Sequence, residues 1–161
     1  PAAWQALIDV NVNGAFNVLR AFLPGLLGSG DAGHVVMMSS VGGLSVGAGQ
    51  SGYIASKFAM RVMGQCLRED LRRIDAPVGV TVVLPGPVRT NIFKNAATGG
   101  AAGAAQRTEL AQMLERYGLE PVEVAEMVFR SIEADEFWLH THPEMSREAI
   151  DEQHRELLSA F

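Results

Sequence analysis

The sequence predicts an α/β domain built on a parallel sheet, and three consecutive stretches carry that prediction. Residues 35–38 and 78–84 are short, continuous apolar runs, which is how strands read when a parallel sheet is covered on both faces. Between them, residues 51–75 repeat apolar side chains at the three- and four-residue spacing of a helix. Strand, helix and strand in this order form a βαβ unit, whose crossover we expect to be right-handed.

The segment before the first strand predicts a helix over residues 1–27, by the same spacing of apolar residues. Pro1 suits the first position of a helix. Asn11, Asn13 and Gly14 are poor helix formers, so a kink is expected where they fall. The glycine-rich residues 28–33 then form a loop.

Beyond the second strand the pattern becomes mainly helical. A short helix is expected with Leu110, Met113, Leu114 and Tyr117 facing inward, and Pro121 opens a further helix that runs to Glu133. The remaining predicted elements are a short strand over 137–139 and a charged amphipathic helix over 145–161.

Composition limits the class of protein. A length of 161 residues is enough for one domain, and a net charge of −5 argues against binding to nucleic acid or to an anionic membrane. Cys66, the single cysteine, falls in a helical pattern and is expected to be buried. There is no secretory leader and no apolar run of about 18 residues, so we expect a cytoplasmic protein.

The candidate chemistry lies between residues 39 and 57. Tyr53 and Lys57 are four residues apart and therefore share one face of the predicted helix. An ammonium held close to a phenol favours the phenolate and lowers the pKa of the phenol, which can then exchange a proton with a substrate oxygen. Ser40, where the first strand ends, could hydrogen-bond the same oxygen. Any amphipathic helix can place a tyrosine and a lysine in this way, so the companion motifs decide the interpretation.

Two other patterns are set aside. Gly43, Gly47 and Gly49 spell G-x-x-x-G-x-G between a strand and a helix, as a dinucleotide-binding loop would. The helix that follows carries Tyr53 and Lys57, so this loop is expected to border the substrate instead. His140 and His142 alternate on the last strand, but further metal ligands at suitable spacing are lacking, so no metal site is predicted and both are interpreted as surface or subunit-contact residues.

Four motifs occur together: Asn11-Val12-Asn13-Gly14, Ser40 thirteen residues before Tyr53, Tyr53-x-x-x-Lys57, and Pro85-Gly86-Pro87-Val88-Arg89-Thr90 after the second strand. In this order and spacing, from Pro1 to about Phe93, the chain resembles the short-chain dehydrogenase/reductase family, in the branch with short subunits. The resemblance implies a Rossmann-like, doubly wound parallel sheet.

Within that fold, residues 1–161 would correspond to the second half of a single domain, with strands five to seven and their helices. The half that grips the dinucleotide would be absent from this chain, which would leave the edge of strand 35–38 exposed. Residues 91–118 would form the substrate lid, whose apolar residues favour an apolar substrate.

The resemblance also implies a mechanism: hydride transfer between NAD or NADP and a carbonyl or secondary alcohol. Tyr53 would be the general acid or base, Lys57 would lower its pKa and bind the nicotinamide ribose, Ser40 would orient the substrate oxygen, and Asn11 would complete a proton relay through a water molecule. The cofactor-binding residues would be Tyr53, Lys57, Pro85, Gly86, Val88 and Thr90. Whether the cofactor is NAD or NADP stays open.

Two alternatives to this oxidoreductase stay open. The chain could be a non-catalytic half-domain that serves as a dimerisation or interaction module, or it could belong to the sugar-nucleotide epimerases and dehydratases, which share Tyr-x-x-x-Lys. The resemblance further implies a homodimer or homotetramer, formed through the helices over residues 1–27 and 51–75.

Overall fold

Three parallel strands form one sheet in the computed structural model, which describes residues 2–91, 108 and 111–161. They are β1 (Gly33–Met38), β2 (Val78–Leu84) and β3 (Trp138–His140), and they lie side by side in that order. Val35 pairs with Val80 and Val83 pairs with Leu139. The three strands agree with those predicted to within two residues, and β1 lies at an edge of the sheet as expected.

The first helix is interrupted where the asparagines fall. It consists of α1 (Ala2–Ile8), the π-helical turn η1 (Asp9–Asn13) and α2 (Gly14–Ser29). The amide of Gly14 donates to the carbonyl of Asp9, five residues back, so the turn holds one more residue than an α-helical turn. The carboxylate of Asp9 accepts hydrogen bonds from the side chains of Gln5, at 2.9 Å, and Asn13, at 2.8 Å. The predicted break in this helix is therefore confirmed, and it takes the form of a π turn.

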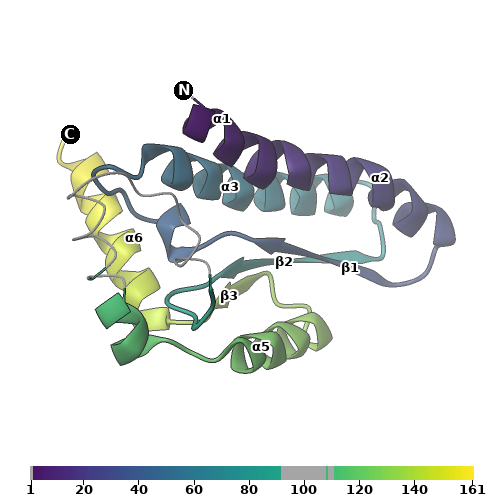
Figure 1. Cartoon of the computed structure of the whole chain (residues 1–161). Helices are drawn as coiled ribbons and strands as arrows, with labels where there is room; N and C mark the ends of the chain where they lie inside the picture. Colours follow the sequence, from purple (N-terminus) through teal and green to yellow (C-terminus); the bar gives the residue numbers. More distant parts are fainter. Residues whose placement is uncertain (1, 92–107, 109–110) are drawn as a thin grey trace.

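The elements are arranged in layers. The elements α1, η1 and α2, together with α3 (Ser51–Arg73), cover one face of the sheet, and α5 (Pro121–Glu133) covers the other (Figure 1). The helix α6 (Pro143–Leu158) stands at the carboxyl ends of the strands, next to the short helix η2 (Val41–Gly43) (Figure 1). The right-handed crossovers expected from the sequence place the helices over residues 1–27 and 51–75 on the same face of the sheet, and this is confirmed.

The close approach of α1 to α3 depends on Gly52. A Cβ atom at that position would lie 3.1 Å from Cδ1 of Leu7 and 3.2 Å from Cε3 of Trp4. At the other side of α3, Met60, Leu67 and Leu71 are buried against β2, whose last three residues are fully inaccessible to solvent. This packing fixes the start of α3 above the carboxyl ends of the strands.

Some expectations were wrong. Cys66 is exposed, not buried. Residues 111–117 are helical, but Met113 and Tyr117 are exposed and only Leu114 is partly buried. Most of the predicted lid, including Leu110, lies outside the described residues. Within the part of the chain that the structure describes, no helix is long and apolar enough to cross a membrane.

Candidate active site

Ser40 lies immediately after β1, at the point where two strand-end loops meet. Its backbone is extended, and its hydroxyl accepts a 3.0 Å hydrogen bond from the amide of Gly42. The same hydroxyl donates a long bond, 3.4 Å, to the carbonyl of Pro85, and the amide of Val41 donates to that carbonyl at 2.9 Å. The loop after β1 is thus tied to the loop after β2, and the Ser40 side chain is held at their junction.

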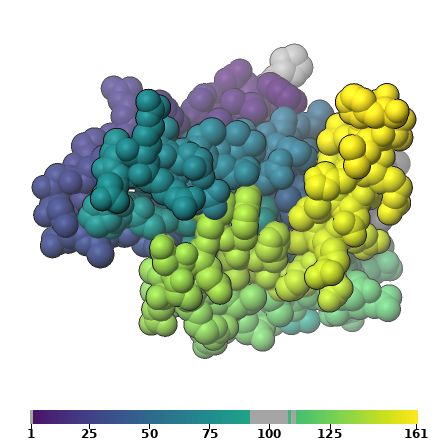
Figure 2. Space-filling view, turned by 180° about the vertical axis from the view of Figure 1, so that it is seen from behind, coloured from purple at the N-terminus to yellow at the C-terminus, as the bar shows by residue number. Residues whose placement is uncertain are grey.

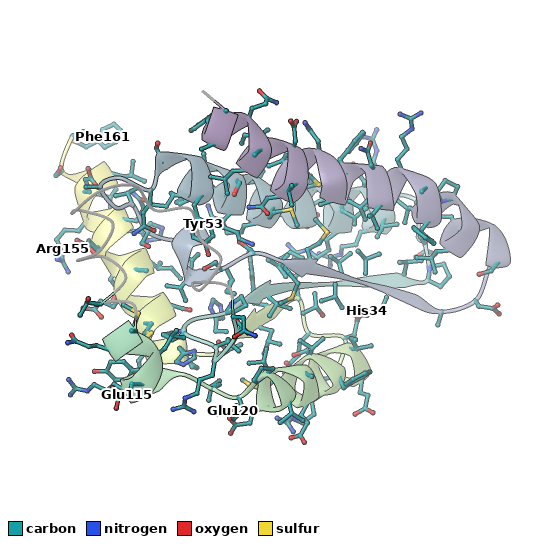
Figure 3. All side chains as sticks on the ribbon, in the orientation of Figure 1. His34, Tyr53, Glu115, Glu120, Arg155 and Phe161 are labelled. Atoms are coloured by element: carbon teal, nitrogen blue, oxygen red, sulfur yellow. The ribbon has the colours of Figure 1, made fainter. Side chains whose placement is uncertain are left out.

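Tyr53 and Lys57 lie in the first two turns of α3, on the same face. The Lys57 Nζ atom is 5.8 Å from the centre of the Tyr53 ring and donates a 3.3 Å hydrogen bond to the carbonyl of Met38, at the end of β1. Figure 3 shows Tyr53 between α3 and the loop that contains η2. The phenol, the ammonium and the end of β1 are therefore neighbours.

Gly42 brings the Tyr53 ring close to Ser40. A Cβ atom at residue 42 would lie 3.0 Å from Cε1 of Tyr53 and 3.5 Å from Oγ of Ser40. A residue with a side chain would have to displace the ring. Gly42 was not predicted as a site residue, although it follows Ser40 by two positions in the loop that faces Tyr53.

Lys57 is held in a partly desolvated position. Burial lowers the pKa of its ammonium below the usual value, because less water surrounds the charged form. None of the ion pairs found among the described residues involves Lys57. A lysine in these surroundings releases and regains a proton more readily than one in water, which suits a group that assists proton transfer.

The backbone of α3 at Lys57 is itself anchored to the loop after β1. The hydroxyl of Ser39 donates a 2.8 Å hydrogen bond to the carbonyl of Lys57. A Cβ atom at Gly43 would lie 2.5 Å from that hydroxyl and 2.9 Å from that carbonyl, so only glycine lets the loop approach so closely. Gly43 therefore has a packing role, and Gly49 has a positive φ of 74° in a turn. Neither glycine needs a dinucleotide to account for it.

Asn11 reaches this region through Ser56. Its side-chain amide donates a 2.9 Å hydrogen bond to the hydroxyl of Ser56, which donates a 2.7 Å bond to the carbonyl of Tyr53. Ser56 is fully buried. The Asn11 side chain thus contacts α3 within the turn that separates Tyr53 from Lys57. Ser56 was not predicted as a site residue; its signal in the sequence is a polar residue three positions after Tyr53, on the buried side of an amphipathic helix.

The loop after β2 runs from Pro85 to Thr90. A parallel bridge joins Val88 to Leu119, and its two hydrogen bonds use the amide of Arg89, at 2.9 Å, and the carbonyl of Pro87, at 3.1 Å. Because successive residues of an extended chain point their peptide groups to opposite sides, the amide and carbonyl of Val88 face away from Leu119. Thr90 is exposed next to this bridge.

Gly86, within this loop, packs closely against His142. The amide of Gly86 donates a 3.0 Å hydrogen bond to the hydroxyl of Thr141, and a Cβ atom at residue 86 would lie 2.6 Å from Nδ1 of His142. That nitrogen lies 2.8 Å from the hydroxyl of Thr141, and Nε2 of His142 lies 2.8 Å from the carbonyl of Tyr117.

His142 is half-buried and connects two loops of its own chain, and the expected surface or subunit-contact role of His140 and His142 stays a prediction. Burial lowers the pKa of His140, whose Nδ1 is enclosed. No cluster of three or more potential metal ligands occurs within residues 2–91 and 111–161.

The site thus collects a hydroxyl, a phenol and an ammonium at the carboxyl end of a parallel sheet, the usual place for ligands in open α/β folds. A phenol close to an ammonium can exchange a proton with an oxygen, and a hydroxyl beside it can hydrogen-bond that oxygen. This is a suitable arrangement for proton transfer to or from a carbonyl or alcohol.

Comparison with known proteins identifies the family. Residues 1–100 match the sequence profile of the family described as short chain dehydrogenase. The putative oxidoreductase SadH of Mycobacterium tuberculosis is 40% identical over 121 residues, which cover 75% of this chain and 43% of SadH. The C alpha-dehydrogenase of Sphingobium sp. is 29% identical over 161 residues, 96% of this chain and 52% of that protein. The chain thus spans about half the length of these curated relatives.

Solved structures show the same fold. A short chain dehydrogenase/reductase from Burkholderia phymatum, in complex with NAD, superimposes with a TM-score of 0.83 at 29% identity, over 91% of this chain and 56% of that one. A short chain dehydrogenase from Burkholderia cenocepacia, in complex with NADP, gives a TM-score of 0.73 at 23% identity, over 99% of this chain and 60% of that one. The fold is therefore Rossmann-like, and the chain belongs to the short-chain dehydrogenase/reductase family.

Proposed function

We propose that the protein to which this chain belongs transfers a hydride between a nicotinamide cofactor and a carbonyl or secondary alcohol, with Tyr53 as general acid or base. The observation that carries this proposal is the convergence of Ser40, Tyr53 and Lys57, which Gly42 makes possible. In reduction, the phenol of Tyr53 gives its proton to the carbonyl oxygen as the hydride arrives. In oxidation, it takes the proton of the alcohol.

The remaining residues support that proton transfer. The ammonium of Lys57 stabilises the phenolate that forms when Tyr53 gives up its proton. Ser40 donates a hydrogen bond to the substrate oxygen, after giving up its long bond to Pro85. Asn11 holds the start of α3 in place through Ser56 and contributes to the path by which the proton is replaced.

The residues of the loop after β2 fit the nicotinamide end of NAD or NADP. The Val88 backbone groups, which face away from Leu119, provide a donor and an acceptor of the kind that a carboxamide needs, and Thr90 provides a hydroxyl. Lys57 carries donors for a ribose hydroxyl, and Pro85 and Gly86 turn the chain beneath the ring. The bound cofactor supplies or accepts the hydride, whereas the protein positions the groups and handles the proton.

We also propose that the protein forms homo-oligomers through the layer made by α1, η1, α2 and α3. Trp4 in α1 and Phe16 and Phe22 in α2 are 46%, 54% and 69% exposed. Exposed large apolar residues that gather on one layer are typical of interaction surfaces. Light scattering coupled to size-exclusion chromatography should give a dimer or tetramer, and a stable monomer would overturn this part of the proposal.

The cofactor proposal is tested by titrating the protein with NADH and NADPH and following nicotinamide fluorescence. We expect saturable binding of at least one of them, followed by turnover with a panel of ketones or secondary alcohols. Failure to bind either cofactor would favour the non-catalytic interaction module instead. Turnover of sugar nucleotides, with none of simple ketones, would favour the epimerases and dehydratases.

The role of Tyr53 is tested by Tyr53→Phe, which removes only the phenolic oxygen. We expect kcat to fall by at least about a hundredfold while cofactor binding is retained, because the lost group acts in proton transfer. Tyr117→Phe, the same chemical change at an exposed tyrosine, is the matched control and should leave kcat unchanged.

A further inference from the structure

Three buried polar atoms lack a hydrogen-bond partner within the described residues, and all three belong to residues that line hollows beside α6. They are Nε of Arg61, Nδ1 of His140 and Oγ of Ser146. His140 and Ser146 line one hollow, Arg61 lines a larger one, and Ile150 of α6 borders both. Figure 2 shows α6 as a yellow ridge along one side of the molecule. Buried polar groups are normally paired, so an unpaired one in a residue that borders a hollow suggests a partner that would enter with a small shift of the side chain.

The larger hollow has a volume of about 320 Å³ and lies between α3, α6 and the residue that follows η2. That volume is at the lower end of the range for small-molecule sites, which is about 300–1,000 Å³. Its lining residues are Leu44, Phe58, Arg61, Ile150, Gln153, His154 and Leu157. The lining is mainly apolar, with one guanidinium and two polar side chains.

No described residue neutralises the charge of Arg61. None of the ion pairs between described residues involves Arg61, and no acidic residue is among the described residues that line the hollow. Its guanidinium lies 5.0 Å from the centre of the Phe58 ring, a contact that leaves the Nε donor unused. Burial lowers the pKa of Arg61, since the charged form loses water without gaining a counter-ion. An anionic group in the hollow would supply both the counter-charge and the acceptor.

The apolar residues that line the hollow indicate the chemistry of the rest of the ligand. Leu44 is buried, Phe58 is half-buried, and Leu157 is exposed at the opposite side, on α6. A short alkyl or aryl body lying between them would remove Leu157 from water, which stabilises the complex in proportion to the apolar area covered. We propose that this hollow is a binding site for a small amphipathic carboxylate, with its carboxylate on Arg61 and its apolar body between Leu44, Phe58 and Leu157.

This site is separate from the candidate active site. Neither Tyr53 nor Lys57 lines the hollow, and Arg61 lies one helical turn beyond Lys57 on α3. The two sites share the helix α3 and the loop after β1, because Leu44 follows η2, whose N-terminal cap is Ser40, but no residue belongs to both. The proposal therefore stands whether or not the protein transfers a hydride.

Isothermal titration with octanoate tests the proposal, with octan-1-ol and acetate as probes that keep only the apolar body or only the charge. We expect octanoate to bind at a single saturable site and the other two to bind at least about tenfold more weakly, because a charged hydrogen bond and the apolar burial each contribute that much. Equal affinity for acetate and octanoate would show that the apolar body contributes nothing to binding, and would overturn the proposal that the ligand is amphipathic. No binding of octanoate would overturn the site.

Arg61→Gln should weaken octanoate binding by at least about tenfold, since it removes the charge and leaves a side chain of similar reach. Arg155→Gln is the matched control, because Arg155 projects outward from α6 (Figure 3), is not among the residues that line the hollow, and gives the same change in net charge. Leu157→Gln, at an exposed position that leaves the core intact, should also weaken octanoate binding. Wild-type affinity in both Arg61→Gln and Leu157→Gln would overturn the proposal.

Discussion

The side-chain amide of Asn11 donates a 2.9 Å hydrogen bond to the hydroxyl of Ser56, a residue 45 positions away along the chain. The hydroxyl of Ser56 in turn donates a 2.7 Å hydrogen bond to the carbonyl of Tyr53. The π turn η1 is therefore linked to the first turn of α3 by two consecutive hydrogen bonds. These hydrogen bonds contribute both to the packing of the helices and to the position of Tyr53, the candidate acid–base residue.

Removing the Asn11 amide should destabilise the fold. Asn11→Ala should lower the free energy of unfolding by about 1–2 kcal/mol, because a buried hydroxyl loses its donor. A double-mutant cycle with Ser56→Ala, followed by urea denaturation, should show a coupling of about 0.5–1.5 kcal/mol. Asn17→Ala, at an exposed position of α2, is the control. Strictly additive effects of Asn11→Ala and Ser56→Ala would show that the hydrogen bond contributes nothing.

Adding a methyl group at Gly42 should impair catalysis more than stability. The new Cβ atom would lie 3.0 Å from Cε1 of Tyr53, so the ring must shift away from Ser40. A displacement of that kind should lower kcat by at least about tenfold, because proton transfer depends on position. Steady-state kinetics with the best substrate of the panel measure the effect.

Gly25→Ala is the matched control for that substitution. A Cβ atom at residue 25 would have nothing within 4 Å, and the position is inside α2, so the change should stabilise the helix by about 0.5–1 kcal/mol without changing kcat. Unchanged kcat in Gly42→Ala would mean that the Tyr53 ring does not need this space.

The helix α3 approaches β2 closely at Gly64. A Cβ atom there would overlap Cγ2 of Val82 and lie 3.4 Å from Cγ of Met37, in the buried core. Gly64→Ala should therefore cost about 1–3 kcal/mol of stability, as overpacking does. Val82→Ala should cost stability alone but relieve the overlap, so the double variant should be more stable than the sum of the single effects predicts. An additive result in chemical denaturation would count against this packing.

The tautomer of His34 follows from its neighbours. The hydroxyl of Thr81 donates to the carbonyl of Glu136 at 2.7 Å, so it accepts from Nε2 of His34 at 2.8 Å. The Nδ1 atom of the neutral ring is then unprotonated and faces the carboxylate of Asp135 at 3.8 Å. Burial lowers the pKa of His34, and the nearby Asp135 opposes that effect without cancelling it.

Stability should consequently decrease when the solution is acidified. Below the usual histidine pKa of 6.5 the unfolded chain binds more protons than the folded chain, because the folded-state pKa of His34 and of His140 is lowered. The free energy of unfolding should fall as the pH drops from 6.5 towards the folded-state values. Urea denaturation at about pH 7.5 and at about pH 5 measures this change. The free energy of unfolding should decrease less between the two pH values for His34→Gln and for His140→Gln than for the wild type. Constant stability over this range would contradict the assignment.

The sequence predicted what depends on local pattern. The spacing of apolar residues identified the strands, and the chemistry of Tyr53 and Lys57 followed from one helical turn between them. It also located the break at Asn11, since asparagine and glycine disfavour helix interiors. It did not show that the break is a π turn, because the number of residues in a turn is set by packing of α1 on α3.

Contacts between distant residues could not be predicted. The hydrogen bond from Asn11 to Ser56 and the fit of Gly86 against His142 depend on how layers and loops meet in space. The alternation of His140 and His142 did not reveal that His142 would be half-buried against the loop at Gly86. Cys66 was expected to be buried for a similar reason. The spacing of apolar residues identifies the buried side of a helix but does not show where the edge of the buried stripe lies.

The π turn also determines the rotational phase of α1. An extra residue in one turn rotates everything before it by about 100° around the helix axis relative to an uninterrupted helix. Trp4 and Leu7 meet Gly52 only with that phase. Deleting one residue from Asp9–Asn13 would therefore not shorten a loop; it would rotate Trp4 away from α3 and present a different face of α1 to the rest of the molecule. In sequence comparisons, a single-residue gap at this position marks a helix with a different packing face.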